Sequence, residues 1–481
     1  TIYRYNVISG MNGESAVDSG YFVTQSESSG EIEVYFNHTV DTSVNLGEYA
    51  KGKQNFESLL IDRINHANHS IDITLFEFSY YTDIANALVQ AKDRGVKIRF
   101  IYNHSANTPQ LDTLIAHGIL VIKRDVDTAH SMHNKFIIFD YRNHINPFEP
   151  RLWTGSTNFT HAQLHSDRNN VIVVQDEALC AIYTREFEEM WGSHTDWPDT
   201  SRSRFGTQKT DNVPHILNVS GTRMEVYFTP SDRVAAFLEN LIINNTSKSI
   251  YFCMLKANIP EMENTLHTIF KNGCSVKGVF DLDNSMINGC IYPRMKGLPV
   301  EGAWNPPAYV FTDPITGLIH HKYFILDAAH PSGNKIISTG SFNWEITADS
   351  ANDDNSLTIF SARVNNLYLQ EFCARYEESC GENIGWNIGD LPVPTGQIIL
   401  LAAPNPFHTF TTIRYELAGE GLVYLSIFDA LGRETTNLVS KRQGPGMYQI
   451  NWDASQYHEG VYTCTLSFNG STFTRKILLL R

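Results

Sequence analysis

Apolar and polar segments follow one another in the same order in two long stretches of the chain. "EVYF" occurs at 33–36 and again at 225–228. Each copy is followed by an apolar run, "NHSIDITLFEFS" (68–79) in the first and "TSKSIYFCML" (246–255) in the second. Runs of this length predict buried strands. The shared order of segments indicates an internal repeat.

The segments that follow these strands predict a helix and then another strand. "TDIANALVQAKDRGVKIRFIYN" (82–103) and "MENTLHTIFKNGCSVKGVFD" (262–281) both begin with helical spacing. In each, a glycine stands where a helix would end, and an apolar stretch comes next. Each copy closes with a further apolar strand and a helix, at 170–191 and 355–378. This β-α-β pattern predicts an α/β sandwich in each copy.

Beyond residue 400 the pattern changes to short strands separated by turns, which predicts a small all-β sandwich. The expected fold class is therefore α/β, with two repeated sandwich halves and a β-domain. The first copy also carries an extra segment, 40–53, for which the pattern predicts no role. The predicted organisation is an N-terminal extension (1–30), a first half (31–196), a linker (197–222), a second half (223–385), a second linker (386–399) and the β-sandwich (400–481).

Charge and hydropathy limit the class of protein. The net charge is −15, from 37 Lys and Arg against 52 Asp and Glu. Such a chain lacks the broad basic surface of a general nucleic-acid binder, although a local basic cleft remains compatible with it. No apolar run reaches the roughly 18 residues needed to cross a bilayer. The chain starts at Thr1 without a signal-like segment, which fits either a processed protein or a trimmed one.

The cysteines and histidines do not predict a metal site. There are seven cysteines and no C-x-x-C, which argues against a zinc ribbon. One or two disulfides are compatible with this number, but an odd count leaves at least one cysteine unbridged. Cys373 and Cys380 are too far apart to bridge if they lie on one continuous helix. We therefore expect no metal and no cofactor.

One motif, H-x-K-x-x-x-x-D, occurs once in each copy. It gives His133, Lys135 and Asp140 in "MHNKFIIFD", and His320, Lys322 and Asp327 in "IHHKYFILD". In a strand, His and Lys two positions apart lie on the same face. Imidazole can act as nucleophile or proton donor near neutral pH, and an ammonium group suits a phosphate oxygen.

A second motif, G-S-x-N, follows in each copy. It offers Ser156 and Asn158, or Ser341 and Asn343, as hydrogen-bond donors to anionic oxygens. One copy supplies half of a mechanism, whereas two copies supply two histidines around one anion. One histidine can attack phosphorus while the other protonates the leaving oxygen, and these are opposite protonation demands. The repeat therefore predicts one pseudo-twofold active site.

Together, the doubled motifs resemble the phospholipase D superfamily, the HKD enzymes, over about 31–385. The resemblance implies a metal-independent phosphodiesterase with a phosphohistidine intermediate. It implies that His133 is the nucleophile and His320 the general acid. Lys135, Lys322, Ser156 and Ser341 would hold the phosphate, together with Asn158 and Asn343. Asp140 and Asp327 would stabilise their strand ends.

Family members also have a carboxylate about eleven residues past the G-S-x-N asparagine. This position is Asp354 in the second half and Asn169 in the first, a departure from the family pattern. The resemblance implies that Asp354 orients His133 of the opposite half, as an Asp orients a hydrolase His. The corresponding partner of His320 would then be the side-chain amide of Asn169 instead of a carboxylate. The neighbours Asp353 and Asn170 remain alternatives for these two positions.

Other residues near the motifs are expected to have ordinary roles. His130 and His321 do not fit the motif offset, so neither is assigned a function. Trp153, Phe159 and Trp344 flank the motifs and are expected in the core, because aromatic residues there more often pack than bind substrate.

The segments "APNPFHTFTTIRYEL", "IFDALGRE" and "GVYTCTLS" resemble the sorting domain of type IX secretion substrates, over about 400–481. This resemblance implies that the type IX secretion machinery is a partner and that the protein is secreted or held at the cell surface.

The substrate remains open between two phosphodiesters. A phospholipase D would hydrolyse or transfer a phospholipid headgroup, with peripheral membrane contact. An endonuclease would cleave DNA or RNA. The net acidity favours the lipid, because nucleic acid needs a basic groove. A non-enzymatic binding protein fits less well, because both copies keep His and Lys. Both halves belong to one chain, so a monomer is expected.

Overall fold

The computed structural model describes residues 2–11, 14–79, 82–103, 108–124, 130–330, 332–380, 400–403, 407–417, 420–444, 446–469 and 471–480. The chain divides into two compact units. The larger, mainly Asn45–Ala328 and Gly333–Ile384, contains both repeats, and the smaller, mainly Gly385–Arg481, contains the β-domain. The second predicted linker, 386–399, lies outside the described residues.

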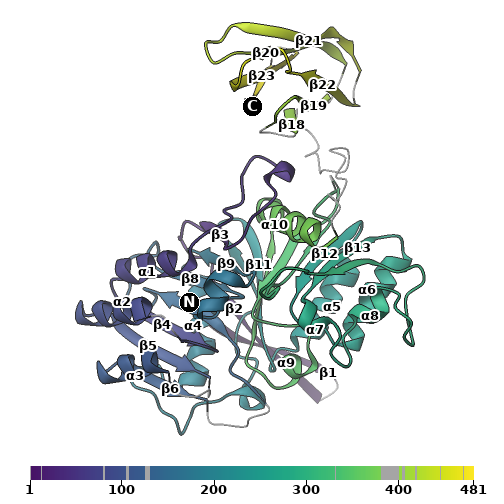
Figure 1. The fold of residues 1–481 in the computed structure, drawn as a ribbon. Helices are drawn as coiled ribbons and strands as arrows, with labels where there is room; N and C mark the ends of the chain where they lie inside the picture. Colours follow the sequence, from purple (N-terminus) through teal and green to yellow (C-terminus); the bar gives the residue numbers. More distant parts are fainter. Residues whose placement is uncertain are drawn as a thin grey trace. The chain divides into compact units, whose positions relative to one another are not determined.

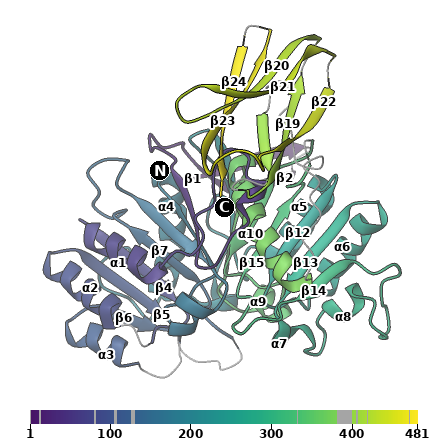
Figure 2. The ribbon, with the colours of Figure 1, turned by 45° about the horizontal axis from the view of Figure 1, so that its top comes forward.

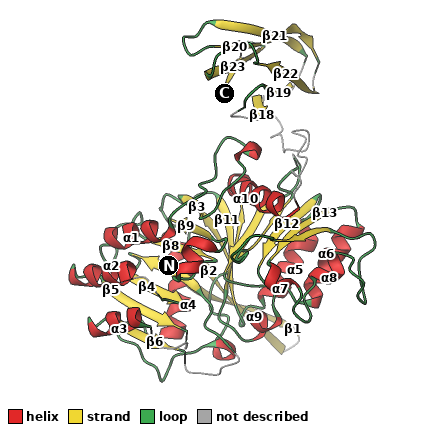
Figure 3. Ribbon diagram, in the orientation of Figure 1, coloured by secondary structure: helices red, strands yellow, loops and turns green. Residues whose placement is uncertain are grey.

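The first half is a sheet with helices on both faces (Figures 1 and 3). Its strand order is β3-β9-β8-β7-β4-β5-β6. β4, β5 and β6 are parallel, and β7 runs antiparallel to β4. The strands are β3 (Ile32–Phe36), β4 (Ser70–Leu75), β5 (Lys97–Tyr102), β6 (Leu120–Lys123), β7 (Lys135–Phe139), β8 (Arg151–Gly155) and β9 (Asn170–Val174). The helices are α1 (Phe56–His66), α2 (Thr82–Asp93), α3 (Pro109–Ala116) and α4 (Glu177–Trp191).

The second half repeats this arrangement, with strand order β10-β11-β17-β16-β15-β12-β13-β14. Its strands are β10 (Ile216–Val219), β11 (Thr222–Phe228), β12 (Ser249–Met254), β13 (Ser275–Phe280), β14 (Tyr309–Thr312), β15 (Lys322–Leu326), β16 (Ile336–Gly340) and β17 (Asn355–Phe360). Its helices are α5 (Val234–Asn245), α6 (Pro260–Lys271), α7 (Leu282–Ser285), α8 (Tyr292–Met295), α9 (Ile346–Ser350) and α10 (Ala362–Cys380). The predicted α/β repeat is thus confirmed.

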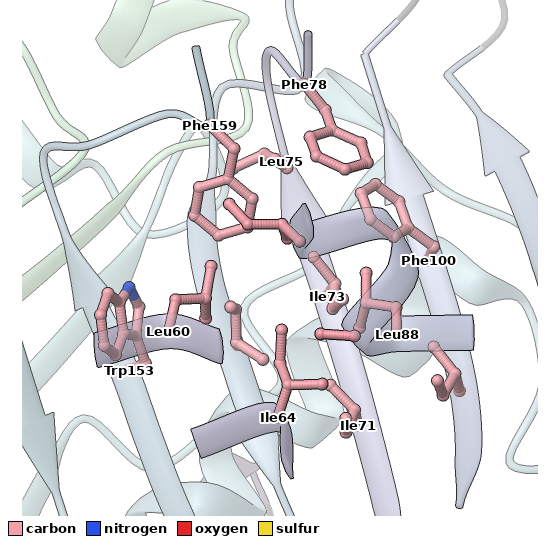
Figure 4. Close-up of a cluster of buried hydrophobic side chains, with 14 of the residues drawn as sticks. Leu60, Ile64, Ile71, Ile73, Leu75, Phe78, Leu88, Phe100, Trp153 and Phe159 are labelled. Atoms are coloured by element: carbon pink, nitrogen blue, oxygen red, sulfur yellow. The ribbon is translucent and has the colours of Figure 1, made fainter. Parts of the chain in front are cut away.

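Each half has its own apolar core between the sheet and its outer helices. In Figure 4, Leu60 and Ile64 of α1 and Leu88 of α2 lie over Ile71 and Ile73 of β4. The alternating apolar residues of the helices therefore pack on the strands that the sequence predicted as buried. The three flanking aromatic residues are also core residues, as expected, because each is at most 2% exposed: Trp153, Phe159 and Trp344.

α4 and α10 each contact a strand of the other half, β10 and β3 respectively. The extra segment 40–53 strengthens this junction because it binds α10. The Gln370 side chain of α10 accepts a hydrogen bond from the Ala50 N–H at 2.9 Å and donates one to the Glu48 carbonyl at 2.9 Å. The segment without a predicted role therefore ties the first half to the second.

Two further regions contain structure for which the sequence analysis made no prediction. The N-terminal extension contains an antiparallel hairpin, β1 (Ile2–Met11) with β2 (Glu14–Val23). The first linker contains β10 and the buried Lys209. None of the seven cysteines, all within the described part of the chain, forms a disulfide.

The β-domain consists of two sheets, ordered β18-β19-β22 and β21-β20-β23-β24 (Figure 2). The buried Trp452 and Leu425 belong to the core between these sheets. The strands are β18 (Leu400–Ala403), β19 (Phe410–Leu417), β20 (Gly421–Phe428), β21 (Glu434–Gln443), β22 (Gly446–Asp453), β23 (Gly460–Phe468) and β24 (Ser471–Leu479). Among the described residues, no helix has the length and apolar character needed to span a bilayer.

Candidate active site

The two H-x-K motifs lie where the halves meet. β7 begins at Lys135 and pairs with the carboxyl end of β4, and β15 begins at Lys322 and pairs with the carboxyl end of β12. Each motif histidine therefore stands just before its strand rather than inside it. The sequence predicted both residues within the strand, and the difference arises because the residues before each Lys pair with the opposite half.

Two short cross-half pairings hold these segments. In one, the His133 N–H donates to the Asp353 carbonyl at 2.8 Å, and the Asp353 N–H donates to the Ser131 carbonyl at 2.9 Å. In the other, the His320 N–H donates to the Arg168 carbonyl at 3.0 Å, and the Arg168 N–H donates to the Leu318 carbonyl at 2.8 Å. Backbone hydrogen bonds thus fix each histidine to the other half.

His133 is paired with a carboxylate. Its Nδ1 lies 2.6 Å from Asp354 Oδ1, and the Ser341 hydroxyl donates to the same oxygen at 2.6 Å. The Phe76 ring lies edge-on to the imidazole, with 5.0 Å between the ring centroids. A histidine that donates its Nδ1 proton to a carboxylate keeps its Nε2 lone pair for chemistry.

His320 is paired with an amide instead. Its Nδ1 lies 3.0 Å from Asn169 Oδ1, and the Ser156 hydroxyl donates to this oxygen at 2.7 Å. The amide orientation follows from its other end, because Asn169 Nδ2 donates to the Gln163 carbonyl at 2.9 Å. The Asn169 oxygen therefore faces His320 and accepts the Nδ1 proton.

These contacts settle which residues lie beside the histidines. The alternatives Asp353 and Asn170 contact other groups. Asp353 forms ion pairs with Arg124 at 3.0 Å and Lys209 at 3.3 Å. Asn170 Nδ2 donates to His321 Nδ1 at 3.0 Å. The residues next to the motif histidines are therefore Asp354 and Asn169.

The two lysines complete the constellation. Lys135 Nζ donates to the His133 carbonyl at 2.7 Å, and Lys322 Nζ donates to the His320 carbonyl at 2.6 Å. Each lysine is only 3% exposed. Burial lowers the pKa of Lys135 to about 7, and burial together with the Lys135 charge lowers the pKa of Lys322 well below its usual value. An anion bound between them would restore both positive charges.

The histidines are also held neutral. Burial lowers the pKa of His133 to about 4, although Asp354 acts in the opposite direction. Burial and the charges of Lys322 and Lys135 lower the pKa of His320 well below its usual value. Burial alone would raise the pKa of Asp354, but His133 and Lys135 hold it below its usual value. The resting site thus has an ionised carboxylate next to one histidine only.

The remaining motif residues fall into two groups. Asn158 and Asn343 are 2% and 4% exposed, and the Oδ1 atom of each has no hydrogen-bond partner within the described part of the chain. Ser156 and Ser341 give their single hydroxyl proton to Asn169 and Asp354. The serines therefore orient the residues that hold the histidines, a geometry that differs from the phosphate contact predicted for them.

The motif aspartates lie at the far ends of their strands. Asp140 Oδ1 accepts a hydrogen bond from the His69 N–H at 2.7 Å. Asp327 Oδ1 accepts hydrogen bonds from the N–H groups of Lys248 at 2.8 Å and Ser249 at 2.9 Å. Each carboxylate thus fixes the turn that leads into β4 or β12, which fits the structural role expected for both.

Sequence reasoning missed a buried network behind the second motif. His321 is 1% exposed, and its Nε2 lies 2.9 Å from Glu371 Oε1. Glu371 also accepts a hydrogen bond from Tyr323 and lies 3.4 Å from Arg375. The first copy has Asn134 in place of His321, so the repeat gave no signal for this network.

Within the described residues, one group has metal-like spacing: Asp211, His215 and Asp232. His215 Nδ1 already lies 2.9 Å from the Val226 carbonyl, and Asp232 accepts a hydrogen bond from the Phe228 N–H at 2.8 Å. These residues lie in or beside β10 and β11. Hydrogen bonding thus accounts for the cluster.

Comparison with known proteins identifies the class to which this fold and site belong. The model of the family described as "Cardiolipin synthase, PLD-like domain" matches residues 60–191 and again 241–376, together more than half of the chain. The chain belongs to this family, within the phospholipase D superfamily. Residues 402–480 match the secretion system C-terminal sorting domain, so the protein is secreted or displayed at the cell surface.

Among individual relatives, the chain is similar to the mitochondrial cardiolipin hydrolases of Chlamydomonas reinhardtii and Homo sapiens. Each is 31% identical over 137 residues, which is 28% of this chain and 56% or 50% of the relative. The chain thus spans about half the length of these curated relatives.

Among solved structures, the phosphatidylserine synthase of Haemophilus influenzae aligns over 66% of this chain and 82% of its own, with 13% identity and a TM-score of 0.47. Nuc, a phospholipase D family member from Salmonella typhimurium, aligns over 35% and 99%, with 23% identity and a TM-score of 0.26.

Proposed function

We propose that this protein is a secreted, metal-independent phosphodiesterase that hydrolyses or transfers the headgroup of a phospholipid through a phosphohistidine on His133. The observation that carries this proposal is the pair of unequal cross-half contacts, His133 with Asp354 and His320 with Asn169. Two histidines that meet at one site and differ in their partners suit the two different protonation states that the chemistry needs.

In the first step, His133 Nε2 attacks phosphorus and the bond to the leaving oxygen breaks. His320 gives its Nε2 proton to that oxygen, so the headgroup alcohol leaves neutral. The imidazole ring of His133 becomes cationic when the P–N bond forms, and the Asp354 carboxylate stabilises this charge. Lys135, Lys322 and the side-chain amides of Asn158 and Asn343 would hold the non-bridging oxygens.

In the second step, His320 acts as the base. It takes a proton from water, whose oxygen attacks phosphorus, and the P–N bond breaks to release the phosphatidate and free His133. An alcohol in place of water gives the transfer product. Before the first step, the negative charge of the bound phosphodiester favours protonation of His320. The protonated His320 then releases this proton readily, because its partner at Nδ1 is a neutral amide.

A lipid fits the surroundings of the second motif better than a nucleic acid. The sequence stretches 255–260, 281–291, 312–321 and 343–354, which surround the second motif, contain one lysine, Lys256, and no arginine. Lys256 lies 3.7 Å from Glu345. A nucleic-acid groove needs several unpaired basic side chains along the backbone path. The names of the cardiolipin hydrolases also support a phospholipid substrate.

A paired assay in EDTA tests this function. Phosphatidylcholine vesicles with added ethanol would be one substrate, and plasmid and single-stranded DNA the other. We expect phosphatidic acid and phosphatidylethanol from the wild type and none from His133→Ala. DNA cleavage with a steep negative salt dependence and no lipid turnover would establish the nuclease instead. A requirement for added metal would overturn the mechanism.

A further inference from the structure

Large exposed apolar side chains gather on three segments around the second motif. Their exposed fractions are 51% for Leu282, 65% for Met286, 50% for Ile287, 43% for Ile315 and 53% for Ile346. Single exposed apolar residues are common on any protein. Here five come from three loops on the same side of one half, and we call these five residues the apolar rim.

Hydrogen bonds join these loops to one another and to the catalytic segment. Asp281, next to Leu282, accepts a hydrogen bond from the Ile319 N–H at 3.1 Å, and Ile319 immediately precedes His320. The Ile346 N–H donates to the Asn258 side chain at 2.9 Å. Ala257, which precedes Asn258, is bonded to the segment that follows β13, because its carbonyl accepts a hydrogen bond from the Ile291 N–H at 3.0 Å.

The third loop is attached in the same way. The Asp313 N–H donates to the Phe280 carbonyl at 3.0 Å, and the Asp313 side chain accepts from the Ile315 N–H at 3.0 Å. α7 and α9, which carry Leu282 and Ile346, are drawn next to each other in both Figure 1 and Figure 2. The apolar rim therefore lies at the carboxyl ends of β12 and β13, beside the site.

The charges around the apolar rim disfavour a strongly anionic partner. Asp283 is exposed between two rim residues, and Glu345 precedes Ile346 and pairs with Lys256. The whole chain carries a charge of −15, which disfavours attraction to an anionic surface. The exposed side chains of the rim favour a partner that is bound mainly through apolar contact.

We propose that the apolar rim inserts into the surface of a phospholipid bilayer and places the site over the headgroups. This inference rests on the proposed phospholipid activity and adds how the substrate is reached. Exposed Leu, Met and Ile side chains on short loops and short helices can enter the boundary between headgroups and acyl chains while the polar backbone stays hydrated. Binding of this kind depends on apolar area and responds little to salt.

The test compares the full-length wild type with the triple variant Leu282→Ser, Met286→Ser, Ile287→Ser. A matched control replaces three exposed apolar residues at the other end of the sheets, Ile145, Phe148 and Ile243, which are 82%, 55% and 40% exposed. Each protein is assayed for sedimentation with phosphatidylcholine vesicles, for hydrolysis of those vesicles, and for hydrolysis of monomeric dihexanoylphosphatidylcholine.

For the rim variant, we expect vesicle binding, and the ratio of vesicle to monomer hydrolysis, to fall about tenfold or more, as the loss of apolar insertion predicts. The control variant should keep the wild-type ratio. Equal ratios in all three proteins, or a wild type that hydrolyses the monomer without binding vesicles, would overturn the rim proposal and leave the phospholipase intact. A wild type inactive on both lipids would instead overturn the function on which it rests.

Discussion

The two motif histidines have the same place in their repeats but different partners at Nδ1. Asp354 faces His133 at 2.6 Å, whereas Asn169 faces His320 at 3.0 Å. A carboxylate stabilises a cationic ring, and a neutral amide does so far less. One difference between two equivalent positions of the repeat is therefore enough to give the two histidines of a pseudo-symmetric site different electrostatic surroundings.

Changing the amide into a carboxylate should move the pH profile. In Asn169→Asp the new negative charge raises the pKa of His320, so this group stays protonated to higher pH. We expect the alkaline limb of kcat/KM to shift upward by about one pH unit, with a lower maximal rate because the acid is weaker. The reciprocal Asp354→Asn should lower kcat about a hundredfold without that shift. An unchanged alkaline limb in Asn169→Asp would count against His320 as the acid.

Anion binding should also take up protons. Burial lowers the pKa of Lys135 to about 7, so much of this group is neutral at pH 8. A bound phosphate or tungstate raises the pKa of both Lys135 and Lys322 again, and we expect an uptake of about one to two protons per anion at pH 8 and less at pH 6. Calorimetric titration in two buffers of different ionisation enthalpy measures this uptake. Heats that do not depend on the buffer would contradict it.

Among the elements, the two cross-half pairings and the linker hold the site together. The sequence repeat predicted the strands, the helices and the motif residues, because each has a local signal. It did not reveal that Lys209 of the linker is buried between Glu186 of α4 and Asp353 before β17. Ion-pair partners this distant in sequence leave no shared periodicity that the sequence analysis could detect. Neither the hairpin β1–β2 nor the packing of segment 40–53 on α10 could be predicted.

Removing the linker ammonium should destabilise the larger unit. Although burial alone would lower the pKa of Lys209, Glu186 and Asp353 raise it, so it is charged in the folded protein. Lys209→Met leaves the buried Glu186 without its cation and leaves Asp353 with Arg124 alone, and we expect a loss of about 3 kcal/mol in the free energy of unfolding at pH 8.

The loss of unfolding free energy in Lys209→Met should become smaller as the pH falls toward 5. Burial raises the pKa of Glu186 above its value in the unfolded chain. Without Lys209 this carboxyl binds a proton in the folded state before it does so in the unfolded state, and stability then rises as the pH falls. Urea unfolding at both pH values measures the effect. Lys51→Met, at a half-exposed pair with Glu33, serves as the control and should cost less than about 1 kcal/mol.

For the whole molecule, all candidate catalytic residues belong to the larger compact unit, and the sorting domain forms the core of the smaller one. The doubled motifs and the change of pattern near residue 400 made this division predictable. Which loops are apolar and exposed was not predictable, because exposure depends on the packed tertiary structure.

Removal of the β-domain should therefore abolish export but leave the catalytic activity intact. We expect a chain of residues 1–384 to hydrolyse monomeric dihexanoylphosphatidylcholine at the rate of the full-length protein, within about twofold, because no candidate site residue is lost. The same chain should remain inside a host that exports the full-length form. A large loss of the rate on the monomeric lipid, with unfolding excluded by circular dichroism, would show that the β-domain contributes to catalysis.

The most direct test of one site with two different histidines is a burst experiment with bis(p-nitrophenyl) phosphate in EDTA. Nitrophenolate is a good leaving group, so the first step depends little on an acid, whereas breakdown of the phosphohistidine needs the base. We expect His320→Ala to release one equivalent of nitrophenolate per site and then stall, and His133→Ala to release none. A burst from His133→Ala but not from His320→Ala would contradict the assignment, and the absence of a covalent intermediate in every variant would contradict the mechanism.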